Sequence, residues 1–237
     1  MFQRLVSLGA DVGARDNLGR NILHHIADCR DNAKDEACYK SSLQTILASA
    51  PNLLEKTDGE GQTPLHYAAL GTTSCQKTEL AKTLLSAGAN ANAADENGDT
   101  ALHILARDLN TVAQRALFED IGQIRGADVN ACNTLGETPL FEFSGRPDKY
   151  YNVEPLGEGA VPMLERLGVD FCARDNRGRG VLHVAASGRV ERFRELMDMG
   201  LDVMLEDETH QTAIDVPAAC DNMAVLELFE KVRSVYI

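Results

Sequence analysis

Histidine is the side chain most often used for proton transfer near neutral pH and for metal binding, and the chain has six. Four of them directly follow a leucine in a recurring segment: His24, His66, His103 and His183. A metal site needs ligands that converge on one point, whereas stacked helices lie roughly 8–10 Å apart. The shared position therefore predicts a shared structural role. His25 follows His24 directly, and because adjacent helical residues do not face each other, we interpret it as a partly exposed residue.

Other reactive residues show no catalytic or metal-binding pattern. The cysteines, at positions 29, 38, 75, 132, 172 and 220, form no C-x-x-C pair, so scattered reduced thiols are favoured over a zinc or disulfide site. Five aspartates instead begin turn-like segments: Asp16, Asp58, Asp95, Asp175 and Asp207. No G-x-S-x-G, G-x-x-x-x-G-K or H-E-x-x-H motif occurs. We predict no catalytic residue, no cofactor and no metal, since only the abundance of acids favours an enzyme.

A turn followed by a short helix is predicted for residues 58–69, which read DGEGQTPLHYAA. The Asp-x-x-Gly start suits a type I turn. The Thr-Pro pair suits the N-cap and the first position of a helix, where a missing N–H costs nothing. The leucine and two alanines that follow form a narrow apolar face, which another helix can approach closely.

Related segments recur along the chain. They begin at Asp16, Asp95, Asn133, Asp175 and Asp207. The pattern resembles the ankyrin repeat, whose signature contains T-P-L-H-x-A at a period of 33 residues. The resemblance implies an all-α fold, an ankyrin-like helical solenoid of stacked helix–turn–helix repeats with short hairpin turns. It also implies that the imidazole ties neighbouring hairpins together through backbone hydrogen bonds.

The repeats divide the chain into units. We predict a single ankyrin-repeat domain over 1–237, made of a partial repeat (1–15), five full repeats (16–57, 58–94, 95–132, 133–174 and 175–206) and a C-terminal capping repeat (207–237). The partial repeat lacks its first half. We interpret the chain as a fragment of a longer array, or as one that begins beside a docked neighbouring domain.

Four units exceed the family period. The motif leucine or its counterpart stands at 23, 65, 102, 140, 182 and 214, giving gaps of 42, 37, 38, 42 and 32 residues. Most extra residues fall between the two helices of a repeat. We attribute them to drift, because solvent loops tolerate insertions. Around Tyr150 and Tyr151, a recognition loop is an equal alternative.

Several positions depart from the repeat pattern. Second helices are expected near 42–49 and 160–167, and Gly122 stands where such a helix should carry a leucine, so we predict a shifted or broken helix there. Phe141 replaces the motif histidine. Phe143 replaces a small alanine, so its ring must displace a neighbour or fill a gap. His210 replaces the turn glycine.

Charge and hydropathy limit the partners. The net charge is −13, from 23 basic and 36 acidic residues. Phosphate binding needs a basic stripe, so we predict no nucleic-acid partner and, for the same reason, no membrane partner. No apolar run reaches the roughly 18 residues that span a bilayer. We expect an intracellular protein, cytoplasmic rather than nuclear.

The residues that the motif leaves variable should point from the hairpin tips into a concave groove of the resembled fold. The candidate partner-binding residues are Leu18, Arg20, Glu60, Gln62, Glu96, Asn97, Asp99, Leu135, Glu137, Arg177 and Arg179. Acids lie in the middle of this strip, arginines flank them, and the two leucines suit apolar anchors. An ordinary solvated strip is the alternative. Asn92 and Asn130 match asparagines that some ankyrin proteins offer to a hydroxylase, but a structural role is the default.

These observations favour a non-catalytic interaction module. It would bind an unidentified protein or peptide through the hairpins and first helices. The alternative is a targeting or autoinhibitory segment of a larger enzyme or signalling protein, motivated by the partial first repeat. A self-assembling structural role also stays open. Ankyrin arrays serve many functions, so the resemblance does not name the partner.

Overall fold

Short helices alternate with hairpin loops along the computed structural model. It describes residues 8–28, 36–70, 75–107, 109, 112–124, 126–145, 160–188, 190–216 and 222–228. The chain divides into two compact units, Met1–Ala101 (unit 1) and Leu102–Ile237 (unit 2), and each is described by itself. The predicted repeat boundaries stay predictions.

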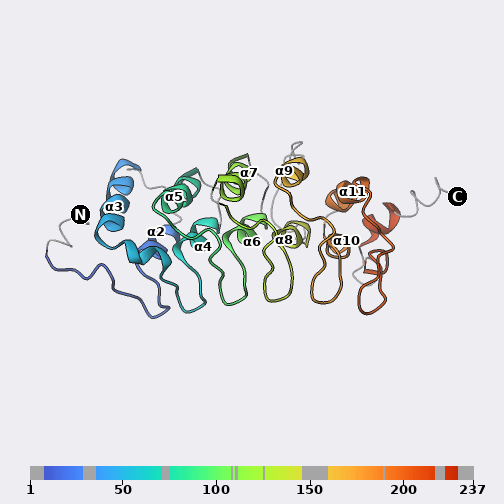
Figure 1. Cartoon of the computed structure of the whole chain (residues 1–237), viewed down its shortest axis with the longest axis horizontal. Coiled ribbons are helices and arrows are strands. Elements are labelled where there is room, and N and C mark those ends of the chain that lie inside the picture. The colour runs from blue at the N-terminus through green and yellow to red at the C-terminus, as the bar shows by residue number, and fades with distance from the viewer. Residues whose placement is uncertain are drawn as a thin grey trace. The chain divides into compact units, whose positions relative to one another are not determined.

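Unit 1 holds two helix pairs. Its elements are α2 (Ile22–Asp28), α3 (Glu36–Ser49), the 3₁₀ helix η1 (Pro51–Glu55), α4 (Pro64–Ala69) and α5 (Cys75–Ser86), and α6 (Ala101–Ala106) begins at its last residue. Helix α4 packs against both α2 and α5. In Figure 1 the hairpin loops of unit 1 lie on the side of α2 and α4 away from α3 and α5.

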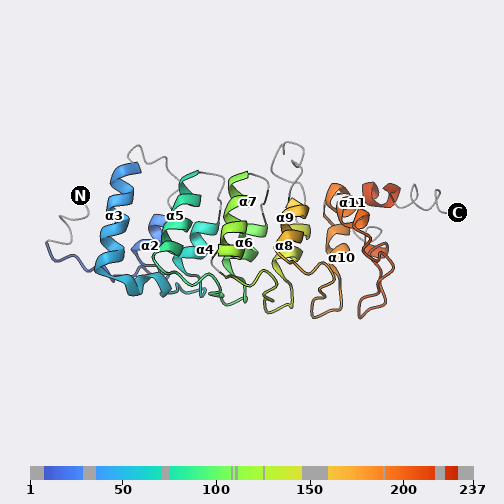
Figure 2. The same cartoon turned by 45° about the horizontal axis from the view of Figure 1, so that its top comes forward.

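Unit 2 continues the same alternation. After α6 come α7 (Val112–Glu119), the π-helical turn η2 (Asp120–Ile124), α8 (Pro139–Gly145), α9 (Ala160–Arg166), α10 (Val181–Ala186) and α11 (Val190–Asp198). Helix α10 packs against α8 and α11, and α7 packs against α9. Figures 1 and 2 both show the hairpin loops of unit 2 on one side of α6, α8 and α10.

The motif residues form the first helix of each pair as predicted. Thr63, with extended backbone, precedes α4, and Pro64 is its first helical residue. Leu65, Ala68 and Ala69 are all buried. The small side chains let α2 and α5 pack closely on this six-residue helix, which would be too short to form alone.

Two phenylalanines lie on the equivalent helix of unit 2, at positions where the repeat pattern has histidine and alanine. Phe141 and Phe143 on α8 are both almost fully buried. The guanidinium carbon of Arg192, on α11, lies 3.9 Å from the centroid of the Phe143 ring. This cation–π contact shows that Phe143 fills space between α8 and α11 and holds a buried arginine there.

The second helices agree with the sequence-based expectation in one place and depart from it in another. Helix α3 begins at Glu36, six residues before the predicted start at 42, so part of the supposed loop is helical. A shifted or broken helix was predicted at Gly122; α7 ends at Glu119, and the chain continues through Gly122 as the π-helical turn η2, so the helix changes form there without stopping. A Cβ at Gly122 would lie 3.0 Å from Val129 Cγ1, so the space for a leucine is already occupied. The Tyr150–Tyr151 loop lies outside the described residues.

Extended backbone contributes little to the fold. Within the described residues, it pairs at two isolated antiparallel bridges, Ala94 with Thr100 and Arg174 with Gly180, each at the base of a hairpin. None of the described helices is long and apolar enough to cross a membrane. The all-α class predicted from the sequence is confirmed.

Candidate partner-binding surface

Each hairpin ends in a five-residue tip. The six tips are tip 1 (16–20), tip 2 (58–62), tip 3 (95–99), tip 4 (133–137), tip 5 (175–179) and tip 6 (207–211). In every tip the backbone N–H of the first residue donates to the carbonyl of the fifth, and the N–H of the fourth donates to the carbonyl of the first. Tips 1 to 3 belong to unit 1, and tips 4 to 6 belong to unit 2.

The first side chain of each tip holds the loop closed. Asp58 Oδ1 accepts hydrogen bonds of 2.9 Å from the N–H groups of both Glu60 and Gln62. The same pair of bonds recurs at Asp16, Asp95, Asn133, Asp175 and Asp207. Burial raises the pKa of Asp58, but these donors and the Tyr67 hydroxyl lower it by more. The prediction that these residues form turns is confirmed.

A left-handed residue completes every tip. The fourth position is glycine in tips 1 to 5, with φ between +73° and +79°. His210 takes this position in tip 6 with φ +60°, which makes it the one positive-φ non-glycine residue among those described. Its Nδ1 lies 2.9 Å from Glu206 Oε2. The predicted replacement of a turn glycine by His210 is confirmed.

Backbone hydrogen bonds join successive tips within each unit. The second residue of one tip donates its N–H to the carbonyl of the third residue of the tip before it. In unit 1 these bonds are Gly59 N–H to Leu18 O (2.8 Å) and Glu96 N–H to Glu60 O (3.1 Å). In unit 2 they are Asn176 N–H to Leu135 O (2.9 Å) and Glu208 N–H to Arg177 O (3.0 Å). We call this series the tip ladder.

Buried imidazoles form a second tie between hairpins. His66 Nδ1 accepts the N–H of Thr63 at 3.0 Å, and Nε2 lies 3.1 Å from Asp99 O. Because a carbonyl oxygen can only accept, Nε2 must carry a proton. Nδ1 accepts a hydrogen bond and so carries none, which means that the ring is neutral. Burial lowers the pKa of both His24 and His66, which fits this form.

The other motif histidines lie in the same geometry. Nε2 of His24, His103 and His183 lies 2.9–3.0 Å from the carbonyl of Gln62, Glu137 and Gln211, respectively. Each imidazole therefore reaches the fifth residue of the next tip. The predicted structural role is confirmed.

Asn130 acts as a similar brace in unit 2. Its side-chain N–H donates to Gly168 O at 3.0 Å, and its Oδ1 accepts the N–H of Asp170 at 2.8 Å. Both ends of the amide are thus used, as the structural interpretation expected. Asn92 is exposed, and its N–H donates to Asn90 Oδ1.

The described residues contain no group of three histidine, cysteine or acidic side chains that could hold a metal ion. Cys132 and Cys172 are exposed free thiols. Cys29 and Cys220, and the side chains of Cys38 and Cys75, lie outside the description.

The candidate residues differ in exposure. The side chains of Leu18 and Leu135 are 60% and 56% exposed. Glu60, Glu96, Asn97 and Arg177 are exposed as well, whereas Arg20, Gln62, Glu137 and Arg179 are half-buried. Asp99 is only 5% exposed. From the sequence, all variable tip positions were expected to face solvent, but in tips 1 to 5 the residue at the fifth position is half-buried or buried.

Charged side chains at the fifth tip position form ion pairs with other tip residues. Arg20 Nε lies 2.8 Å from Asp16 Oδ2 in tip 1. Arg179 Nη2 lies 2.6 Å from Asp175 Oδ2 and 3.1 Å from Glu137 Oε1 in unit 2. Two of the arginines predicted to flank the acidic strip, Arg20 and Arg179, are therefore largely neutralised. Among the described tip residues, Glu60 and Glu96 take part in no ion pair.

Polar side chains on the first helices, or directly after them, form bonds that were not predicted from the sequence. Tyr67 donates its hydroxyl to Asp58 Oδ2 at 2.7 Å, and burial and this carboxylate raise its pKa to about 12. In unit 2, Arg107 forms two hydrogen bonds to Glu142, of 2.9 and 3.1 Å. Tyr67 and Glu142 stand directly after the position of the motif histidine, where the motif allows any residue. A polar residue at this variable position is the sequence signal that could have predicted them.

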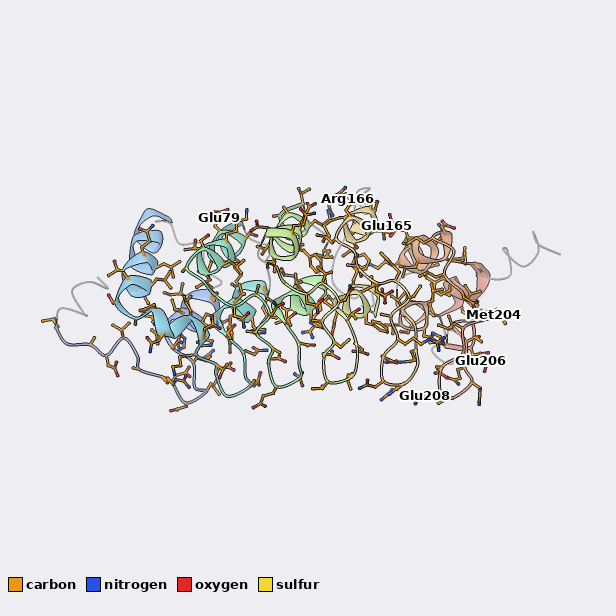
Figure 3. All side chains as sticks on the ribbon, in the orientation of Figure 1. Glu79, Glu165, Arg166, Met204, Glu206 and Glu208 are labelled. Atoms are coloured by element: carbon orange, nitrogen blue, oxygen red, sulfur yellow. The ribbon has the colours of Figure 1, made fainter. Side chains whose placement is uncertain are left out.

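The opposite side of each unit carries charges of its own. Figure 3 shows Glu79 on α5 of unit 1, and Glu165 and Arg166 on α9 of unit 2, away from the hairpin tips of their units. Arg166 pairs with Glu119 at 3.3 Å, and Glu79 pairs with Lys82 at 3.6 Å. These residues supply controls for changes at the tips.

Known proteins share this repeat pattern. The family described as ankyrin repeats (3 copies) matches residues 32–123. Human neurogenic locus notch homolog protein 2 is 31% identical over 187 residues, which are 78% of this chain and 7% of the relative. The rat notch homolog protein 1 is 26% identical over 184 residues, 77% of this chain and 7% of the relative.

A nematode protein is also similar. The ANK repeat-containing protein nipk-1 of Caenorhabditis elegans is 27% identical over 200 residues, 81% of this chain and 31% of its own length. The chain thus spans 7% of the two notch relatives and less than a third of nipk-1. By this match, residues 32–123 belong to the ankyrin-repeat family, and the same tip and brace geometry is found in both units.

Proposed function

We propose that the chain is a non-catalytic module that binds a protein or peptide through its hairpin tips and the exposed faces of its first helices. Ankyrin repeats are generally protein–protein interaction modules. One observation carries the proposal: the tip ladder uses main-chain atoms, while the side chains at the second and third tip positions face solvent. A surface prebuilt in this way loses little conformational entropy on binding.

In unit 1 the proposed surface consists of Leu18, Glu60, Gln62, Glu96 and Asn97. Leu18 would be its apolar anchor. Because Glu96 N–H donates to Glu60 O, the two glutamates stand on adjacent tips. Their unpaired charge favours a partner with basic side chains, which the overall charge of −13 would also attract.

In unit 2 the proposed surface consists of Leu135, Glu137, Arg177 and Arg179. Leu135 and Arg177 supply exposed side chains, and Glu137 and Arg179 hold the loops in shape through their ion pair. Arg20 and Asp99 in unit 1 would contribute in the same indirect way, because one is paired and the other buried.

A charge-reversal pair tests the unit 1 surface. The double variant Glu60→Lys, Glu96→Lys should weaken capture of partner proteins from the source cell, followed by quantitative mass spectrometry. The matched control, Glu79→Lys with Glu165→Lys, changes the net charge equally on the sides away from the tips (Figure 3).

The expected result is loss of a defined set of partners in the tip variant alone, with the melting temperatures of both variants within a few degrees of the parent. Equal recovery of all partners by the tip variant and the parent would refute binding at this surface.

A second function is a targeting or autoinhibitory segment within a larger enzyme or signalling protein. This function is favoured by the small share of its relatives that the chain matches, which is 7% of the length of each notch relative. Sequencing the native transcript would test this proposal: an open reading frame that continues beyond the 237 residues supports it, and stop codons bounding them contradict it.

A further inference from the structure

The joint between tips 4 and 5 in unit 2 lacks the imidazole tie. By repeat register, the residue that should reach the carbonyl of Arg179 is residue 141, in the way that His103 reaches Glu137 and His183 reaches Gln211. That residue is Phe141, whose ring has no N–H to donate. The carbonyl of Arg179 therefore receives no side-chain donor from the preceding helix.

The phenylalanine at position 141 also leaves a nearby hydroxyl group without its usual partner. In α4, the hydroxyl of Thr63 lies 2.8 Å from Nδ1 of His66. Thr138 occupies the equivalent position before α8, and its hydroxyl is buried without a hydrogen-bond partner in the structure. A buried unpaired hydroxyl costs free energy, so Phe141 weakens hydrogen bonding on both sides of the joint.

An ion pair lies where the imidazole tie is missing. Arg179 Nη2, on tip 5, lies 3.1 Å from Glu137 Oε1 on tip 4. Backbone and amide bonds also cross this joint, from Asn176 N–H to Leu135 O (2.9 Å) and from Asn176 Nδ2 to Thr134 O (3.0 Å). The joint from tip 5 to tip 6 has a ladder bond of similar length, but keeps His183.

We propose that the joint between tips 4 and 5 is an ion-pair hinge, the point at which unit 2 opens first when ionic strength rises. The side chains of Arg179 and Glu137 are 28% and 17% exposed, so salt can screen this ion pair in part, whereas it has little effect on a neutral imidazole–carbonyl bond. The hinge would let the part of unit 2 that begins at tip 5 move as local ionic conditions change. Opening at this joint does not depend on which partner the tips bind.

Amide hydrogen exchange of the full chain at 50 mM and 500 mM NaCl tests the hinge. The N–H of Asn176 reports the joint between tips 4 and 5, and the N–H of Glu208 is its internal control in the same unit. Salt should raise the exchange rate of Asn176 about two- to fivefold relative to Glu208, the size expected for loss of a partly exposed ion pair. An equal response at both amides would overturn the proposal without requiring any variant.

Variants separate charge from packing. Glu137→Gln keeps an acceptor but removes the charge, so Asn176 should exchange faster at low salt and lose its salt response. Glu191→Gln, at an exposed acidic residue of α11 in the same unit, should change neither the low-salt exchange of Asn176 nor its salt response. Adding Phe141→His to Glu137→Gln should restore protection of Asn176, because the imidazole can reach the carbonyl of Arg179. A salt response that persists in Glu137→Gln would show that the ion pair is not its source.

Discussion

The imidazole Nε2 of His66 lies 3.1 Å from the carbonyl oxygen of Asp99, 33 residues further along the chain. This contact requires a neutral ring with its proton on Nε2. Protonation of Nδ1 would set an N–H against the backbone N–H of Thr63, which already donates to that nitrogen. The tie between two hairpins therefore depends on protonation state.

Stability should fall as pH is lowered from 7 to 5. Burial lowers the pKa of His24 and His66 below the usual value of about 6.5, so the unfolded chain binds protons that the folded chain refuses. The contribution of these rings is complete above the unfolded pKa and is lost as pH falls below it. Thermal unfolding followed by circular dichroism at pH 5, 6 and 7 measures this change. A melting temperature that is constant or rises toward pH 5 would contradict it.

Replacing His66 by phenylalanine should destabilise the chain by about 1–3 kcal/mol, because the hydroxyl of Thr63 and the carbonyl of Asp99 lose their partner in a buried site. The same change should flatten the pH dependence. His25→Gln is the control, since His25 is exposed and its Nε2 lies 3.1 Å from Asp16 Oδ2 in tip 1, the tip of its own repeat; it should cost less than about 0.5 kcal/mol. Urea unfolding gives both values, and equal costs would argue against a brace.

Gly61→Ala should destabilise more than Gly88→Ala. Both glycines have positive φ, +78° and +98°, so both substitutions carry the backbone strain of an L-residue, about 1 kcal/mol or more. A Cβ at Gly61 would also lie 2.8 Å from the backbone nitrogen of Glu96, whereas one at Gly88 meets no atom within 4 Å. The difference between the two losses in free energy of unfolding measures the cost of a side chain where tips 2 and 3 approach closely. Equal losses would mean that the ladder can shift freely.

Asn130→Asp should cost about 1–3 kcal/mol. The substitution removes the donor to Gly168 O and places a carboxylate oxygen against that carbonyl. Asn97→Asp makes the same chemical change on an exposed tip and should have little effect. Chemical unfolding of the two variants provides the comparison, and a mild Asn130 variant would show that its amide does not brace the following hairpin.

The repeated motif was sufficient to predict the tips, the first helices and the braces, because each depends on one residue at one place. Asp58 closes its tip and His66 reaches the next one wherever those residues recur. The motif could not predict what the fifth tip position does. Arg20 folds back onto Asp16, whereas Asp99 is buried, and both outcomes depend on neighbours that the motif leaves open.

The second helices were harder to predict for the same reason. No fixed signature marks where they begin and end. The early start of α3 at Glu36 shows this, and the change from α7 to η2 was foreseen only because Gly122 replaced an expected leucine. Exposure of Leu18 and Leu135 followed the prediction, since nothing in the tip could cover them.

The tip ladder has an evolutionary consequence. Its donors and acceptors are peptide groups, so they persist whatever side chain the second and third tip positions carry. Mutation at those positions can therefore change what the surface recognises at little cost in folding stability. The ladder therefore leaves the second and third tip positions free to change the ligand, whereas changes at the aspartates, glycines and histidines that hold the tips carry a cost in stability.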